Sequence, residues 1–215
     1  MNVIRLVIVS LSLVFLAACS GGGGLLSKSK GDPRSVDVAG LGGLAVSSWT
    51  VSVPPTLSVS EENSIKPRAD IVWHGDPAGP RHQQVAAIFE AALARASAQP
   101  TGTRAVALQI DVIQFHALTP KLRYFAEGQH EIRFGLAATD AETGATIVPR
   151  YVVDATFTGF GGDKAVLAEA KGVSQKLRII EQLVMRITQE LTGAPVGNIS
   201  GEIADFVPLV KAAQS

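Results

Sequence analysis

The stretch "QHEIRFGLAATDAETGATIVPRYVVD", residues 129–154, decides the fold. Its first half alternates apolar and other residues with the period of two that is typical of a half-buried strand. The apolar set there is Ile132, Phe134, Leu136 and Ala138, and after the turn it continues with Tyr151, Val153, Ala155 and Phe157. The link "DAETGA" has turn composition, with Gly144 available for a positive φ. We expect an antiparallel β-hairpin, with Pro149 at an edge or a bulge because proline cannot donate to the ladder.

Further strands are expected before the hairpin. Residues 46–53 alternate and stop at Pro54-Pro55, and residues 69–73 form a short apolar run. A third strand is expected in "RAVALQIDVIQFHAL", residues 104–118, where the strictly alternating set is Val106, Leu108, Ile110 and Val112. Ile113 and Phe115 then shift the phase, which predicts a bulge or a strand with both faces covered.

Two helices are expected. Residues 81–98 place one apolar stripe at helical spacing, made of Val85, Ile88, Phe89, Ala92, Leu93 and Ala96. A longer helix is expected from Lys164 to Leu191, where a seam with alternating spacings of four and three comprises Val166, Ala170, Val173, Leu177, Ile180, Val184, Ile187 and Leu191. Such a seam can mean coiled-coil pairing. Leu167, Ile179 and Leu183 widen it, which favours packing on the hairpin sheet, although Gly172 would weaken a free-standing helix.

The order strand, strand, helix, three strands, long helix indicates an α+β fold. We expect a mainly antiparallel sheet with a β-hairpin packed against two helices, the longer one C-terminal. The chain lacks the strand–helix alternation and the glycine fingerprint of a doubly wound nucleotide-binding domain. Gly193 and Pro195 are expected to close the long helix, and the tail at residues 196–215 is a candidate for one short helix.

The first nineteen residues, "MNVIRLVIVSLSLVFLAAC", have the layout of an export signal. Arg5 precedes an apolar and hydroxyl run from Leu6 to Phe15, which is too short for an ordinary membrane span. The end of this segment, Leu16-Ala17-Ala18-Cys19, resembles the lipobox of bacterial lipoprotein precursors. The resemblance implies a signal peptide at residues 1–18, cleavage before Cys19 and acylation of that cysteine, palmitate included. The alternative is an ordinary signal peptide with an incidental cysteine.

Cys19 is the only cysteine in the 215 residues, so no intramolecular disulfide can form in an oxidising compartment. Acylation would explain a lone thiol in an exported protein, and two or more acyl chains give stable anchoring. Ser20 follows the cysteine, where aspartate would signal retention in the inner membrane of enteric bacteria. We therefore expect anchoring to the periplasmic face of the outer membrane, ahead of the inner membrane.

Composition supports one exported domain on a tether. Residues 19–45 are rich in Gly and Ser and are interpreted as the lipidated cysteine with a flexible tether, leaving residues 46–195 as one periplasmic domain. Removal of Arg5 with the signal leaves 18 basic against 19 acidic side chains, a formal charge of −1. Nucleic-acid binding usually needs a basic face, and nothing in this balance suggests one, so we expect no nucleic acid as a partner.

The segment "IVWHGDPAGPRHQQV", residues 71–85, brings His74, Asp76 and His82 close together in sequence. Glu90 or His116 could complete a metal-ligand set with them, but the spacing matches no familiar metal motif. A structural interpretation is simpler: "GDPAGP" is turn chemistry, Asp76 can accept hydrogen bonds from backbone N–H groups, and His82 is an exposed residue of the first helical turn. A binding surface without metal is the third alternative.

Other candidate sites are weaker. "GFGGDKAV", residues 159–166, lacks the spacing of a phosphate loop, and Asp163 is expected to cap a helix. No serine stands in a G-x-S-x-G pattern, and paired catalytic acids cannot be identified. We expect no enzymatic activity and no cofactor. The loop "TPKLRYFAEGQ", residues 119–129, offers either a cap on the core or a contact surface made of Lys121, Leu122, Arg123, Tyr124 and Phe125.

The overall pattern of lipobox, glycine tether and small α+β domain resembles small Gram-negative envelope lipoproteins. "VSVPPTLSVSEENSIKPRADIVWHGDP", residues 51–77, is similar to uncharacterised lipoproteins of alphaproteobacteria. A more distant likeness is to accessory lipoproteins of lipid-transport ABC systems and of outer-membrane assembly. The resemblance implies a non-enzymatic accessory or scaffold protein with an envelope protein partner. The alternatives are a carrier of an apolar ligand such as a lipid, held between helix and sheet, and a metal-dependent hydrolase centred on His74, Asp76 and His82.

Overall fold

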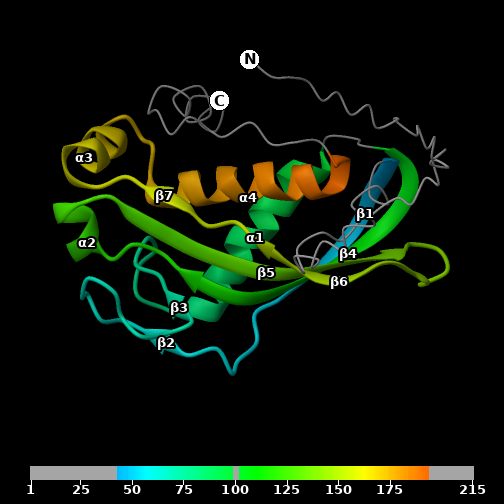
Figure 1. Ribbon diagram of the computed structural model, residues 1–215, viewed down its shortest axis with the longest axis horizontal. Coiled ribbons are helices and arrows are strands. Elements are labelled where there is room, and N and C mark those ends of the chain that lie inside the picture. Colours follow the sequence, from blue (N-terminus) through cyan, green and yellow to red (C-terminus); the bar gives the residue numbers. More distant parts are fainter. Residues whose placement is uncertain (1–42, 99–101, 194–215) are drawn as a thin grey trace, which may run out of the picture. The chain divides into compact units, whose positions relative to one another are not determined.

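The computed structural model describes residues 43–98 and 102–193, and these form an α+β fold, as the sequence predicts (Figure 1). The described strands are β1 (Gly43–Ser52), β2 (Val59–Ser60), β3 (Ile71–Val72), β4 (Gly102–His116), β5 (Gly128–Asp140), β6 (Thr146–Asp154) and β7 (Phe157–Gly159). The described helices are α1 (Arg81–Ser97), α2 (Pro120–Phe125), α3 (Gly162–Ala170) and α4 (Gln175–Thr192). None of these helices has both the length and the hydropathy of a membrane span. The signal peptide, Cys19, most of the tether and the 196–215 tail lie outside the described residues.

The two long strands β4 and β5 pair antiparallel at the centre of the sheet. Along its other edge β4 pairs in parallel with β1 and then, past Asp111, with β3. Along its own other edge β5 pairs antiparallel with β7 at its start and with β6 further on. The strand predicted at 46–53 is therefore β1, which begins three residues earlier than expected and joins the sheet in parallel.

The predicted hairpin is confirmed as β5–β6. Gly144 has φ +70° in its turn, and the Asp140 carboxylate accepts a hydrogen bond from the backbone N–H of Thr143. That bond, with the other donors around it, lowers the pKa of Asp140 to about 2. Pro149 lies where the register passes from Leu136↔Tyr151 to Ala138↔Val148, which is the predicted bulge on an edge strand.

The predicted irregularity in β4 is also confirmed. The pairing with β5 shifts between Val112 and Gln114, so Ile113 is the extra residue of a bulge. Without the bulge, strict alternation would place Phe115 on the opposite sheet face from Val112. With it, Phe115 lies on the same buried face as Val112, and Gln114 lies on the other face. The sheet thus keeps one apolar face along the full length of β4.

The helices α1 and α4 pack against this apolar face and against each other (Figure 1). Every residue of the stripe predicted for α1 is buried. Phe89 of α1 contacts the ring of Phe134 on β5 at a centroid distance of 5.3 Å and that of Phe115 on β4 at 6.4 Å. Arg95 of α1 pairs with Glu181 of α4, which joins the two helices at the edge of the core. The core therefore lies between one sheet face and two crossing helices.

The prediction of a single long helix at 164–191 is wrong, because two helices, α3 and α4, occupy this region. Gly172 has φ +78° and ends α3, and the Ser174 side chain then caps α4 by accepting from the Leu177 N–H. The predicted seam is accordingly interrupted: Val166 and Leu167 on α3 are exposed, whereas α4 buries a stripe of Ile179, Leu183, Ile187 and Leu191. The heptad-like spacing was misleading because it continued through a glycine whose backbone conformation no helix can contain.

Two shorter segments also differ from the sequence prediction. The expected loop at 119–129 contains the six-residue helix α2, which Thr119 and Pro120 initiate. The strand predicted to run through Phe157 divides at Ala155, whose N–H donates to the Ile132 carbonyl. After this division the chain leaves β6 and forms β7 beside the start of β5.

Replacement of Phe134 tests the position of the core. Phe134→Ala removes a fully buried ring between β5 and α1, so it should lower the free energy of unfolding by about 3–5 kcal/mol. Val152→Ala, at a position 51% exposed on β6, is the matched control and should change it by less than about 0.5 kcal/mol. Urea unfolding followed by circular dichroism measures both, and equal losses in the two variants would contradict this placement of the core.

Candidate functional site

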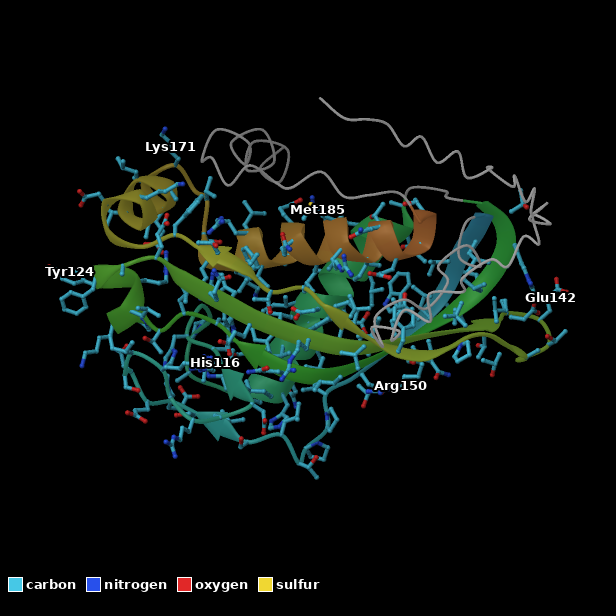
Figure 2. All side chains as sticks on the ribbon, in the orientation of Figure 1. His116, Tyr124, Glu142, Arg150, Lys171 and Met185 are labelled. Atoms are coloured by element: carbon cyan, nitrogen blue, oxygen red, sulfur yellow. The ribbon has the colours of Figure 1, made fainter. Side chains whose placement is uncertain are left out.

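The exposed surface of α2 and α3 is the candidate site, and we call it the α2–α3 surface, defined by Tyr124, Phe125, Val166 and Leu167. Tyr124 and Phe125 are 77% and 66% exposed, and their rings contact each other edge to face. Val166 and Leu167 on the neighbouring helix are 66% and 56% exposed. Figure 2 shows Tyr124 projecting away from the domain at the α2 end. Of the predicted contact surface at Lys121–Phe125, Lys121, Tyr124 and Phe125 are exposed, whereas Leu122 and Arg123 are only partly exposed. The aromatic pair does not cap the core, and the role of these residues in contact stays a prediction.

Local chemistry fixes α2 in this position. The Thr119 hydroxyl accepts from the Leu122 N–H and donates to the Ser64 carbonyl at 2.6 Å, so it caps the helix and ties it to the segment before β3. The Lys121 N–H donates to the Asn63 side chain. Leu122 turns inward over Gly128, where a Cβ would lie only 2.9 Å from the Leu122 side chain. These contacts direct Tyr124 and Phe125 outward.

The helix α3 is held against α2 by an ion pair and by a close backbone approach. Arg123 pairs with Glu169 at 2.7 Å. A Cβ at Gly161 would lie 1.8 Å from the Ala126 carbonyl oxygen, so only glycine fits there. Asp163 does not cap the helix as expected, because Gly161 takes the cap position and Asp163 falls in the first turn. A carboxylate there still favours the positive end of the helix dipole.

A hollow of about 420 Å³ opens between the two helices. Its walls combine apolar groups of Pro120, Tyr124, Ala165 and Val166 with the charged groups of Arg123, Asp163 and Glu169. The Arg123 side chain is 19% exposed, and the side chain of its ion-pair partner Glu169 is 52% exposed. The α2–α3 surface is therefore contoured, with an apolar rim around a partly charged depression.

A buried polar cluster forms the base of this surface. The Leu118 N–H donates to Nδ1 of His130 at 3.3 Å, and the Gln175 side chain donates to the Leu118 carbonyl. Arg178 of α4 lies over the Phe160 ring at 3.4 Å and donates to the Thr158 carbonyl. Burial lowers the pKa of the Arg178 guanidinium to about 10. The cluster therefore joins α4, β7 and the segment before α2.

The residues of the "HGDPAGPRH" segment, residues 74–82, contact different groups. Nε2 of His74 donates to the Glu61 carbonyl at 3.3 Å, and Nε2 of His82 donates to the Leu57 carbonyl at 3.1 Å. Asp76 accepts from the Trp73 indole at 2.9 Å and from Lys176 at 2.8 Å. Burial opposes its ionisation, but these two donors lower the pKa of Asp76 below its usual value. Asp76 therefore joins β3 to α4, and its partners are side chains, not the backbone N–H groups that we expected.

The remaining polar residues proposed from the sequence are also dispersed. Glu90 accepts from the Trp49 indole of β1, and His116 lies beside Glu131 at 3.7 Å on the sheet face that the helices leave uncovered. His82 is half-buried and not exposed as expected. Within residues 43–98 and 102–193, no three His, Cys, Asp or Glu side chains gather closely enough to hold a metal ion.

Three basic residues that join these segments, Arg81, Lys176 and Arg178, were not identified from the sequence. Arg81 is buried at the start of α1 and forms two hydrogen bonds to the Glu61 carboxylate. Lys176 and Arg178 both lie on α4, in the region treated only as part of an apolar seam. A sequence signal existed, since charged residues stand within otherwise apolar helical spacing. The partners Glu61, Asp76 and Thr158, however, lie 20 or more positions away.

The sequence from residue 44 to residue 202 matches the model of a family of unknown function, DUF6778. The chain belongs to this family. The match runs from the second residue of β1 past the end of α4, so DUF6778 is defined over all the described elements. No curated protein sequence matches the chain significantly.

Solved structures similar to this DUF6778 chain include the following two. One is a candidate lipoprotein from Caulobacter crescentus CB15, with a TM-score of 0.33 and 18% identity, covering 50% of this chain and 80% of that one. The other is a DUF330 protein from Xanthomonas campestris, with a TM-score of 0.39 and 14% identity, covering 80% of this chain and 88% of that one. Both are distant from this chain in sequence.

The buried His130 at the base of the α2–α3 surface makes stability depend on pH. Burial, followed by the charges of Arg178 and Arg123, lowers the pKa of His130 from its usual 6.5 to about 3. Below pH 6.5 the unfolded chain therefore binds a proton that the folded chain excludes, and stability falls as the pH drops from 6.5 towards 3. Between pH 7.5 and pH 5 this should cost about 2 kcal/mol.

His130→Gln supplies the comparison, because glutamine does not titrate. Between pH 7.5 and pH 5 the free energy of unfolding of His130→Gln should fall by about 2 kcal/mol less than that of the wild type. This difference does not depend on the absolute stability of the variant. Burial likewise lowers the pKa of His116, but His116 is present in both proteins and its contribution cancels. Equal pH dependence of the two proteins in urea unfolding would show that His130 titrates normally and is not held neutral.

Proposed function

We propose that the protein is a lipoprotein anchored through Cys19 to the periplasmic face of the outer membrane. In this proposal it works by contact, as a non-enzymatic accessory or scaffold component of an envelope assembly or transport system. The observation that carries it is the Leu16-Ala17-Ala18-Cys19 motif at the end of an apolar export segment, in a chain without any other cysteine. Ser20 after the cysteine supports the outer membrane over the inner one.

The roles of the polar side chains support contact over turnover. His74 joins the segments before and after β3, His82 joins α1 to the segment before β2, and Asp76 joins the segment after β3 to α4. His130 bonds the segment before α2, and Arg178 bonds β7. The most exposed apolar groups lie on α2 and α3. The edge of β6 is the second candidate contact surface, because β6 pairs on one side only among the described strands.

The alternative of an apolar-ligand carrier places the ligand between the helices and the sheet. In the described domain that interface contains the contacting rings of Phe89, Phe115 and Phe134, with Trp73 edge-on to Phe115 at 5.7 Å. This packing favours the scaffold role. Native mass spectrometry tests the alternative, since a stoichiometric lipid beyond the covalent anchor would favour a carrier.

Labelling with radioactive palmitate tests the anchor. Wild-type chain should acquire label and remain with the membrane fraction, and Cys19→Ser should acquire none because no other cysteine is present. Ser20→Ala is the matched control, which keeps the cysteine and should label like wild type. An unlabelled wild-type chain, or one recovered free in the cytosol, contradicts the proposal.

Purification from detergent-solubilised envelopes tests the accessory role. The tagged wild-type chain should be recovered with the same partner protein in independent preparations. Cys19→Ser should lose most of that partner, because a chain without an anchor is no longer concentrated at the membrane surface. Recovery of the lipidated chain alone, without a reproducible partner, would speak against a scaffold.

A further inference from the structure

We propose that the α2–α3 surface docks onto the head-group region of the lipid bilayer that holds the chain. This inference rests on the proposed function, because it needs the Cys19 anchor to place the domain beside a bilayer. It assigns one of the two candidate contact surfaces to lipid and leaves the edge of β6 to a protein partner.

The apolar side chains are concentrated at one end of the domain. Among the described residues seven large apolar side chains are exposed, and four of these form the α2–α3 surface. The other three, Val59, Ile65 and Val152, lie on other elements or loops. A cluster of exposed Tyr, Phe, Val and Leu side chains is unusual on a protein surface that faces only water. It suits a membrane interface, where aromatic rings lie at the level of the head groups.

The charged residues around the surface are four cations, Lys121, Arg123, Lys164 and Lys171, and three carboxylates, Glu127, Asp163 and Glu169. The excess of one positive charge suits anionic head groups. Glu169 is paired with Arg123 at 2.7 Å, and Glu127 faces Lys164 at 4.0 Å. Lys121 on α2 and Lys171 after α3 are exposed, and neither forms an ion pair within the described part of the chain (Figure 2 labels Lys171). Two lysines thus flank the apolar group, where their ammonium groups can reach lipid phosphates.

The surface is preformed, so docking onto a bilayer should cost little conformational entropy. The cap at Thr119 fixes the start of α2, and the close approach at Gly161 packs the start of α3 against the end of α2. The buried Arg178 joins the neighbouring helix α4 to β7. Tyr124 and Phe125 also support each other through an edge-to-face contact at 5.2 Å. A preformed apolar group loses less conformational freedom on docking than a mobile loop would.

The proposed anchor allows the surface to reach its own bilayer. Gly43 pairs with the start of β4, which lies beside the Asp140 end of β5, whereas α2 precedes the opposite end of β5. The 13 residues of β5 therefore separate the two ends by about 44 Å. Residues 20–42 between Cys19 and Gly43 number 23 and can span at most about 80 Å. The chain can thus place the α2–α3 surface on the membrane that holds Cys19.

A single introduced cysteine provides the experiment. Cys19 is the only natural cysteine and is blocked by lipid in the anchored protein, so Phe125→Cys can be labelled alone with an environment-sensitive fluorophore. Glu142→Cys is the matched control, since Glu142 lies in the β5–β6 turn at the other end of the domain (Figure 2). The full-length lipidated protein is reconstituted in vesicles of phosphatidylethanolamine and phosphatidylglycerol that contain a lipid with a nitroxide quencher near the head group.

The probe at residue 125 should lose at least about half of its fluorescence in quencher vesicles, as expected for a group at head-group depth, and the probe at residue 142 should lose little. Adding Val166→Ser and Leu167→Ser to Phe125→Cys should reduce the quenching, because both positions are exposed and the domain keeps its core. Vesicles without phosphatidylglycerol should also quench less, since Lys121 and Lys171 lose their anionic partners.

The contrary outcomes separate this inference from the proposed function. If the protein stays with the vesicles while the two probes are equally unquenched, the inference is wrong and the anchor stands. If the probe at residue 125 is shielded only in isolated envelopes, the surface binds a protein and the inference is again wrong. If the protein does not remain with the vesicles at all, the anchor fails and the inference fails with it.

Discussion

The antiparallel pairing of β4 with β5 is the constraint on which the other elements depend. Because side chains alternate along a strand, a shift of one residue in this pairing would exchange the apolar and polar faces of the sheet. The bulge at Ile113 keeps Phe115 on the same face as Val112 and preserves one continuous apolar surface. That surface receives Phe89 of α1 and the buried stripe of α4, so both helices lie on the same side.

The α2–α3 surface exists because the chain turns away from this core at Gly172. A continuous helix from α3 into α4 would have carried Val166 and Leu167 along the same seam as Ile179 and Leu183. The positive φ of Gly172 and the cap at Ser174 begin a new helix in a different direction, which leaves the two α3 residues exposed beside Tyr124 and Phe125. Arg178 and His130 lie buried beside this arrangement. Because burial lowers the pKa of His130, the folded state becomes less stable in acid.

Local patterns in the sequence predicted the elements better than they predicted where those elements end or what they contact. Alternation identified β4, β5 and the β5–β6 turn, and the apolar stripe of α1 was correct at every position, since these depend on neighbouring residues. The seam across Gly172 failed because spacing alone does not reveal backbone conformation. The partners of Asp76 and Arg178 could not be predicted, because folding brings Lys176 and Thr158 to them from distant parts of the chain.

The proposed lipid anchor and the exposed α2–α3 surface together describe a protein that would work at a bilayer surface through contact. Hydrogen exchange followed by mass spectrometry, on the full-length chain in its own membranes and in detergent, tests this claim most directly. We expect slower amide exchange at residues 120–125 and 162–170 in membranes than in detergent, with unchanged exchange in the turn at residues 141–144. The same exchange at 120–125 and 162–170 in both conditions would contradict it.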